Sequence, residues 1–195
     1  MARTVDEAGT ASRILDVAEE LVQTRGFDGF SYAHVASELG VTTPSLHYHF
    51  RSKAELGQAL IERYSARFLA ALQDIERQPG TALSKLEAYA RVYGDVLRRR
   101  RMCLCGMLAA GYDTLPEAMR QAVIRFFDQN ERWLAKVLEQ GAREGSLAFT
   151  GNASMVAQSI IGGLEGAMLV ARPYGDAARF DAAADRLLAG LIKQR

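Results

Sequence analysis

Apolar residues recur at helical spacing along almost the whole chain, and this periodicity restricts the fold more than any other feature. Between residues 11 and 24 they fall at Ile14, Val17, Ala18, Leu21 and Val22, which form one stripe of an amphipathic helix. No stretch alternates apolar and polar residues for long enough to predict a strand. The pattern predicts an all-α fold of about nine helices.

Capping signals indicate where these helices begin and end. Gly40 is typical of a helix end, and Ser31 and Thr43 are expected N-caps, with Pro44 as the first residue of the third helix. A capping box at 114–117 is expected to open the helix that runs to 144, and Asn152 can cap the helix at 155–171. The expected helices cover residues 11–24, 32–39, 43–50, 53–78, 81–101, 114–144, 155–171 and, from 176 or 180, the residues up to 193, with a short apolar segment at 102–112.

Composition excludes several classes of protein. The chain has 195 residues, 49% of them apolar, and a net charge of +1, values that exclude a disordered chain. Residues 155–171 are apolar but contain Gln158, Ser159 and Glu165, and they are at the short limit for a bilayer span, so we interpret them as a buried helix. With two cysteines and no apolar signal segment in residues 1–10, we expect a cytoplasmic protein without membrane association.

The spacing of residues 32–50 is typical of a helix-turn-helix. In this motif two short helices meet through apolar residues, approach closely at a small residue and turn at a glycine. The small residue is Ala36, the turn is Gly40, and the apolar positions are Val35, Leu39, Val41, Leu46 and Phe50. The other residues of the second helix are short or polar, which suits an element that enters the major groove. Two packed helices that bind no DNA would show the same pattern.

The sequence around this motif resembles the N-terminal domain of the TetR (tetracycline-repressor-like) family of bacterial regulators. The resemblance rests on Arg25-Gly26-Phe27, on Ser31 with Val35-Ala36, on Leu39-Gly40-Val41-Thr42, and on the run from Leu46 to Leu56. It is close in this first part of the chain and holds only as an all-helical pattern over the rest. It implies a three-helix DNA-binding domain, residues 1–55, followed by an effector-binding and dimerisation domain, residues 56–195.

The same resemblance implies which residues contact DNA. Thr42, Thr43 and Pro44 would begin the recognition helix, and the full set is Ser31, Thr42, Thr43, Pro44, His47, Tyr48, His49 and Lys53. Family members usually carry tyrosine at the position of His47, and histidine there would make DNA binding depend on pH. Residues 1–55 hold five Lys/Arg against eight Asp/Glu, but residues 40–54 contain no acid. Phosphates respond to this local charge, so we expect modest affinity per protomer.

A domain that reads one half-site binds weakly, so we expect a homodimer on a palindromic double-stranded operator. Gly162, Gly163 and Gly166 lower helix propensity, which indicates a close approach of helices. That approach lies either in a dimer interface formed by the last two helices or inside one subunit.

Aromatic and sulfur-containing residues crowd the second domain, where they would line a pocket for a small apolar or amphipathic effector or simply form core. Glu165 and Arg172 share a helix face and would anchor a polar group of the effector or pair with other residues. The candidates are Tyr64, Phe68, Tyr89, Tyr93, Cys103, Cys105, Met107, Phe127, Trp133, Glu165 and Arg172.

Cys103 and Cys105 point away from each other on a helix, so they suit neither a local disulfide nor a shared zinc. Some members of the family that the chain resembles sense electrophiles through a cysteine, and the arginines at 98–101 would favour a reactive thiol. As small core residues, both cysteines would be inert. We expect no metal and no cofactor.

These observations predict a ligand-responsive transcriptional regulator, a repressor released from its operator by a small molecule or by a thiol reaction. The alternatives are an all-helical enzyme that uses the same pocket and a thiol redox sensor that does not bind DNA. The sequence has no G-x-S-x-G, no H-E-x-x-H and no glycine loop for phosphate, so nothing in it favours an enzyme.

Overall fold

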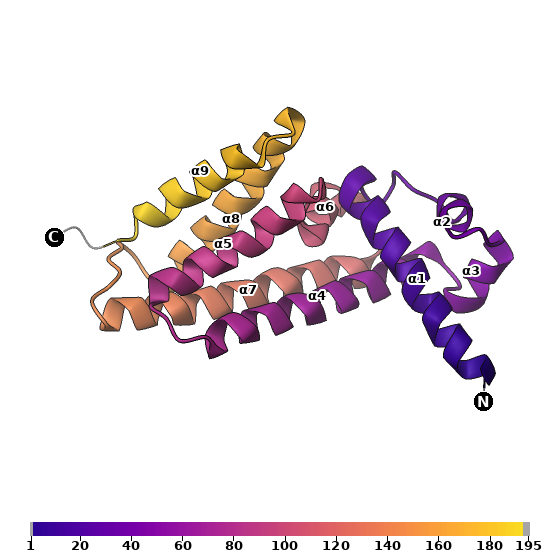
Figure 1. Cartoon of the computed structure of the whole chain (residues 1–195), viewed down its shortest axis with the longest axis horizontal. Coiled ribbons are helices and arrows are strands. Elements are labelled where there is room, and N and C mark those ends of the chain that lie inside the picture. The colour runs from indigo at the N-terminus through magenta and orange to yellow at the C-terminus, as the bar shows by residue number, and fades with distance from the viewer. Residues whose placement is uncertain (1, 193–195) are drawn as a thin grey trace. The chain divides into compact units, whose positions relative to one another are not determined.

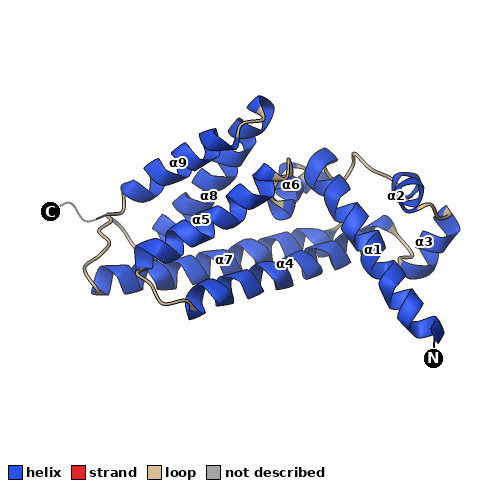
Figure 2. Cartoon of the chain, in the orientation of Figure 1, coloured by secondary structure: helices blue, strands red, loops and turns tan. Residues whose placement is uncertain are grey.

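The computed structural model describes residues 2–192, and all of its long elements within that range are helices (Figures 1 and 2). The expected all-α class is therefore confirmed. The α-helices are α1 (Ala2–Arg25), α2 (Tyr32–Leu39), α3 (Thr43–His49), α4 (Lys53–Arg77), α5 (Ala82–Arg98), α6 (Leu104–Ala110), α7 (Glu117–Arg143), α8 (Ala153–Ala171) and α9 (Ala177–Ala189). Two 3-10 turns, η1 (Tyr112–Thr114) and η2 (Arg172–Tyr174), complete the set.

Several helix ends differ from the sequence expectation. The N-cap of α3 is Thr42, which has extended backbone angles, so Thr43 is already helical and Pro44 lies one residue further in. Proline is still tolerated there, because the first N–H groups of a helix have no partner inside it. The sequence places the end of α5 at 101, but Arg100 has a φ of 59° and the helix stops at Arg98. The last helix, expected to reach residue 193, ends at Ala189 with Gly190 as its C-cap.

The start of α7 also differs. The chain forms η1 where a capping box at 114–117 was expected, and α7 begins only at Glu117. The Thr114 hydroxyl is 2.7 Å from Oδ2 of Asp28, to which it donates a hydrogen bond. A contact between residues distant in sequence thus replaces the local cap.

The chain divides into two compact units. Unit 1 contains the residues up to Ala66 together with Leu104–Ile124, and unit 2 contains Arg67–Cys103 and the residues from Arg125 onward. In unit 1, α1 packs against α2 and α6, and α2 packs against α3. Packing is tight at Gly57 on α4, because a Cβ atom would lie 2.6 Å from the end of Met119 and 2.8 Å from Phe27.

In unit 2, α8 and α9 lie side by side and α5 packs against both (Figure 1). Side chains cap two of these helices: Asn152 accepts from the Met155 amide at 2.8 Å, as the sequence predicts, and Asp176 accepts from the Ala178 amide at 2.9 Å. At Gly163 a Cβ atom would lie 2.9 Å from Leu187, so this glycine permits the close approach of α8 to α9 inside one chain.

Helix α8 is buried along one face only. Together with η2 it forms Ala153–Tyr174, the one described segment that is long and apolar enough to cross a membrane by length and composition. Only its inner face is buried. The opposite face exposes Met155, Leu169 and Val170, each about 60% accessible. The expectation of a buried helix therefore holds for one face only.

A buried hydrogen bond fixes the helix-turn-helix. The hydroxyl of Tyr32 on α2 donates to the carbonyl oxygen of Phe50, the C-cap of α3, at 2.8 Å. Gly40 adopts a φ of 66°, which glycine accepts without strain, and lets the chain turn between the two helices. Burial, followed by the charge of Glu55, raises the pKa of Tyr32 to about 12, so its hydroxyl remains a donor.

Replacement of Tyr32 by phenylalanine should remove this bond and leave the Phe50 carbonyl without its partner. We expect the free energy of unfolding of Tyr32→Phe to fall by about 1 kcal/mol in urea denaturation. Tyr112→Phe, which removes the same hydroxyl from a half-buried tyrosine in η1, is the matched control. Equal stabilities of Tyr32→Phe and the wild-type protein would show that the hydrogen bond does not hold α3.

Candidate functional site

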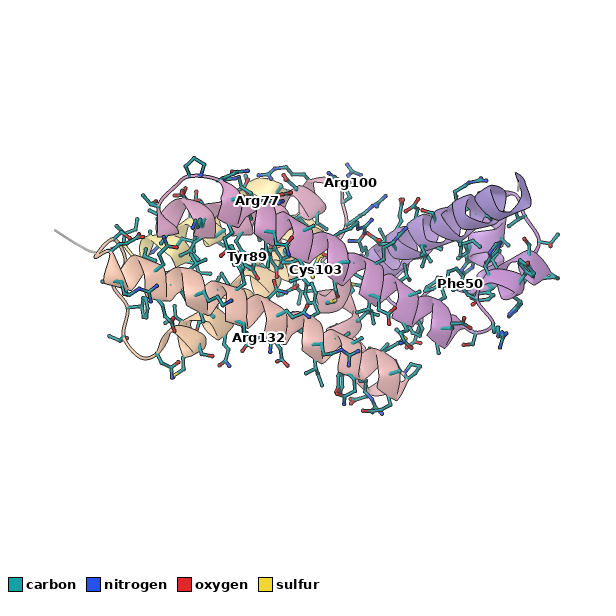
Figure 3. The ribbon with its side chains drawn as sticks, turned by 90° about the horizontal axis from the view of Figure 1, so that it is seen from below. Phe50, Arg77, Tyr89, Arg100, Cys103 and Arg132 are labelled. Atoms are coloured by element: carbon teal, nitrogen blue, oxygen red, sulfur yellow. The ribbon has the colours of Figure 1, made fainter. Side chains whose placement is uncertain are left out.

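The outer face of α3 is uncovered within its unit. Leu46 is the buried residue of this helix, whereas Thr42, Pro44, His47 and Tyr48 are exposed. The Tyr48 side chain is 71% accessible, a large value for an aromatic residue. Figure 3 labels Phe50 at the end of this helix, in the part of unit 1 that carries the helix-turn-helix. The outer face of the helix can therefore enter a groove while its inner face stays packed in unit 1.

The remaining DNA-contact candidates lie at the two ends of α3 and at the starts of α2 and α4. Ser31 is the exposed N-cap of α2, and its amide donates to Nδ1 of His34 at 3.2 Å. Thr43 and His49 are half-buried. The Lys53 ammonium lies 4.5 Å from the ring centre of Phe30 and 4.6 Å from that of Phe27, and burial lowers its pKa while Asp28 partly offsets the shift.

The acidic residues of the first helix are partly neutralised inside unit 1. Arg63 on α4 pairs with Asp16 at 2.8 Å and with Glu19 at 3.0 Å. A single positive charge thus offsets part of the charge of two of the eight acids counted in residues 1–55. The domain total therefore overstates the negative charge that a phosphate would meet at the acid-free segment 40–54.

A second group of candidates meets in the centre of unit 2. Tyr89 and Tyr93 on α5 are fully buried, and their hydroxyl oxygens are 3.1 Å apart. Tyr89 donates its one proton to Oδ1 of Asn130 on α7, at 3.2 Å, so Tyr93 is the donor to Tyr89. Trp133 stacks on Tyr89 at 5.7 Å between ring centres, and Phe68 makes edge contacts with both tyrosines. We call these residues the aromatic cluster.

Glu165 and Cys103 adjoin the aromatic cluster. Burial raises the pKa of the Glu165 carboxyl to about 7, and a hydrogen bond from the Cys103 thiol acts in the opposite direction. Although part of this side chain reaches the surface, its Oε1 atom is buried and has no hydrogen-bond partner among the described residues. The charge of Glu165 in turn raises the pKa of both tyrosines further, after the larger effect of their burial. Figure 3 labels Tyr89 and Cys103.

Other effector candidates lie elsewhere. Tyr64, Cys105 and Met107 belong to unit 1, where Met107 approaches Gly26. Phe127 is half-buried beside Phe126. Arg172 lines a separate cavity of about 530 Å³ between the end of α5 and η2.

Sequence reasoning missed Asn130, which closes the hydrogen-bond chain of the aromatic cluster and is 1% exposed. Its signal was available: it is a polar residue at the core position of α7 between Phe126 and Leu134, four residues from each. Among the described residues no group of three or more potential metal ligands comes together.

A neutral side chain at position 165 should stabilise the fold in a pH-dependent way. Between its ordinary value near 4.5 and about 7, the carboxyl has lost its proton in the unfolded chain but keeps it in the folded one, so stability falls as the pH rises through this window. Above pH 7, Glu165→Gln should exceed the wild type by about 3 kcal/mol in urea denaturation, and at pH 4 the two should agree.

Glu139→Gln, at an exposed position of α7, is the matched control and should follow the wild-type curve. A difference in free energy of unfolding between the wild type and Glu165→Gln that stays the same from pH 4 to pH 8 would contradict the assigned burial of this carboxyl.

Known proteins match both parts of the chain. The family described as "Bacterial regulatory proteins, tetR family" matches residues 14–60, and "Tetracyclin repressor-like, C-terminal domain" matches residues 82–187. The HTH-type transcriptional repressor NemR of Escherichia coli K12 is 28% identical over 173 residues, 85% of each protein. The transcriptional regulator AcuR of Cereibacter sphaeroides is 27% identical over 157 residues, 78% of this chain and 72% of AcuR.

Solved structures agree with these sequence matches. A TetR-family transcriptional regulator from Agrobacterium tumefaciens is 32% identical and superposes with a TM-score of 0.92, covering 96% of this chain and all of that one. The reduced form of E. coli NemR is 25% identical, with a TM-score of 0.82 over 95% of this chain and 98% of that one. Since these matches extend over the helix-turn-helix and most of the helices that follow it, the chain belongs to the TetR family of bacterial transcriptional regulators.

Proposed function

We propose that this ligand-responsive regulator is a repressor that binds a palindromic operator as a homodimer and releases it when a small molecule occupies the aromatic cluster. The observation that carries the proposal is the exposed outer face of α3 within a segment free of acidic residues. The DNA contacts would come from Ser31, Thr42, Thr43, Pro44, His47, Tyr48, His49 and Lys53. TetR-family regulators are not enzymes, so the enzyme alternative is not supported. Operator binding would place its action in the cytoplasm.

The dimer would form through α8 and α9. Met155, Gly162, Gly166 and Leu169 follow one another at helical spacing on the exposed face of α8, and a Cβ atom at either glycine would meet nothing within 4 Å. A shallow, mostly apolar groove of about 530 Å³ runs beside them between α8 and α9. Exposed apolar surface of this extent on a helix pair is typical of a protein interface. A second copy, related by a two-fold axis, would cover it on both protomers.

Release by effector binding has more support than release by a thiol reaction. Cys103 is 1% exposed and lies beside the Glu165 carboxyl, and a negative neighbour disfavours the reactive thiolate. The arginines at 98–100 are exposed, and Arg98 pairs with Asp95 and Asp181. A non-covalent effector that prefers the DNA-free conformation would shift the equilibrium without such chemistry.

Operator recognition can be tested by selecting bound sequences from a random duplex pool. We expect a palindrome, with affinity that falls steeply as salt rises. Tyr48→Ala should weaken binding to the selected duplex at least tenfold, a typical loss for a direct contact, without lowering the melting temperature. Arg132→Ala, at an exposed position of α7, is the control. No bound duplex at low salt, or undiminished binding by Tyr48→Ala, would refute this interface.

The dimer interface has its own test. Val170 is 63% exposed and lines the groove, so Val170→Glu would place a charge in the proposed contact and should yield monomers in sedimentation equilibrium at micromolar concentration. Ile124→Glu introduces the same charge at an exposed apolar position outside the groove and should remain dimeric. A Val170→Glu variant that remains dimeric would show that the interface lies elsewhere.

A further inference from the structure

Two buried polar atoms of unit 2 have no hydrogen-bond partner among the described residues: Oε1 of Glu165 and Nε1 of Trp133. Buried polar groups in folded proteins are nearly always paired, and each unpaired one costs free energy. Both belong to one neighbourhood, because Trp133 stacks on Tyr89 and the charge of Glu165 acts on Tyr89 and Tyr93. The neighbourhood thus offers a free acceptor and a free donor together.

The neighbouring polar groups are already engaged with one another. Tyr93 donates to Tyr89, Tyr89 to Asn130, and the amide nitrogen of Asn130 to the Phe126 carbonyl at 2.8 Å. The Cys103 thiol, a weak donor, provides the one hydrogen bond that acts on the pKa of Glu165. Among the described residues the carboxyl therefore has neither a strong donor nor a cation to compensate its burial.

The rings around it favour a positive charge. Phe68 lies edge-on to Tyr89, Tyr93 and Phe126, with ring centres 5.2–6.0 Å apart, and Trp133 completes this wall. The faces of aromatic rings carry partial negative charge and attract cations, most strongly in the case of tryptophan. A carboxylate that adjoins such rings has the charge that attracts an organic ammonium group.

We propose that the effector site of this regulator takes an organic amine in its protonated form, whose N–H donates to Oε1 of Glu165 while its apolar body packs on Tyr89 and Trp133. The proposal rests on the proposed function, because it assigns the chemistry of the effector that the regulator responds to. Nε1 of Trp133 is left to donate to an acceptor elsewhere on the same molecule.

Other ligand chemistry fits the site less well. An anionic ligand would be repelled by Glu165 unless that carboxyl were protonated. A neutral alcohol would donate one hydrogen bond but would leave the buried negative charge uncompensated. These two classes are therefore the comparison ligands in the test.

Trp133 is the only tryptophan of the chain, so its fluorescence reports directly on this site. The probes are butylammonium, benzylammonium and 2-phenylethylammonium, each titrated beside the alcohol of the same skeleton and beside 3-phenylpropanoate. At pH 8 we expect at least one ammonium probe to bind ten times more tightly than its alcohol and than the carboxylate. An alcohol or carboxylate that binds as well, or the failure of all three ammonium probes at millimolar concentration, would overturn the proposal.

Variants connect the preference to Glu165. Glu165→Gln should lose the tenfold preference for ammonium over alcohol, and Glu139→Gln on α7 should retain it. The wild-type affinity for the ammonium probe should rise about tenfold from pH 6 to pH 8, because a carboxyl with a pKa of about 7 becomes ionised over this range. The titratable group that acts on the pKa of Glu165 is Cys103, and Glu165 acts in turn on Tyr89 and Tyr93, which burial keeps protonated.

A Glu165→Gln variant that keeps the preference, or a preference that does not change with pH, would overturn the assignment to this carboxyl. DNA binding is measured separately in the absence of any probe. A protein that binds its operator but no ammonium probe leaves the regulator function intact and removes this inference alone. A protein that binds the probe but no duplex DNA keeps an ammonium site but loses the regulator function on which its role as effector site rests.

Discussion

The buried contact between α2 and the end of α3 is the constraint on which DNA reading depends. α3 is too short to be stable alone, since isolated helices of fewer than about 12 residues rarely form in water. It persists because Leu46 is buried and because the Tyr32 hydroxyl binds the carbonyl that ends the helix. With its inner side held in this way, the outer side is free to carry exposed polar residues.

Much of the architecture could be predicted from local signals. Helical periodicity and caps such as Asn152 specify most elements, because both act within a few residues of the sequence. The starting residue of α3 was misplaced by one position, since Thr42 and Thr43 are equally good caps by residue type. The hydrogen bond of Thr114 to Asp28 could not be foreseen, because it joins residues that are distant along the chain.

The same distinction applies to the candidate sites. The exposed residues of α3 are adjacent in sequence, so one motif reveals them together. The aromatic cluster assembles side chains from α4, α5 and α7, and the sequence could name only its aromatic members, as an unordered set. Cys103 and Glu165 are 62 positions apart (165 − 103), and their hydrogen bond follows from tertiary packing alone.

The division of the chain into two units has a mechanical consequence. The backbone passes from one unit to the other between Ala66 and Arg67, between Cys103 and Leu104, and between Ile124 and Arg125. The first and third crossings run through the continuous helices α4 and α7, which resist bending, whereas the second lies at the start of α6. Cys103, whose thiol donates to the Glu165 carboxyl, therefore lies one peptide bond away from the unit that holds the recognition helix.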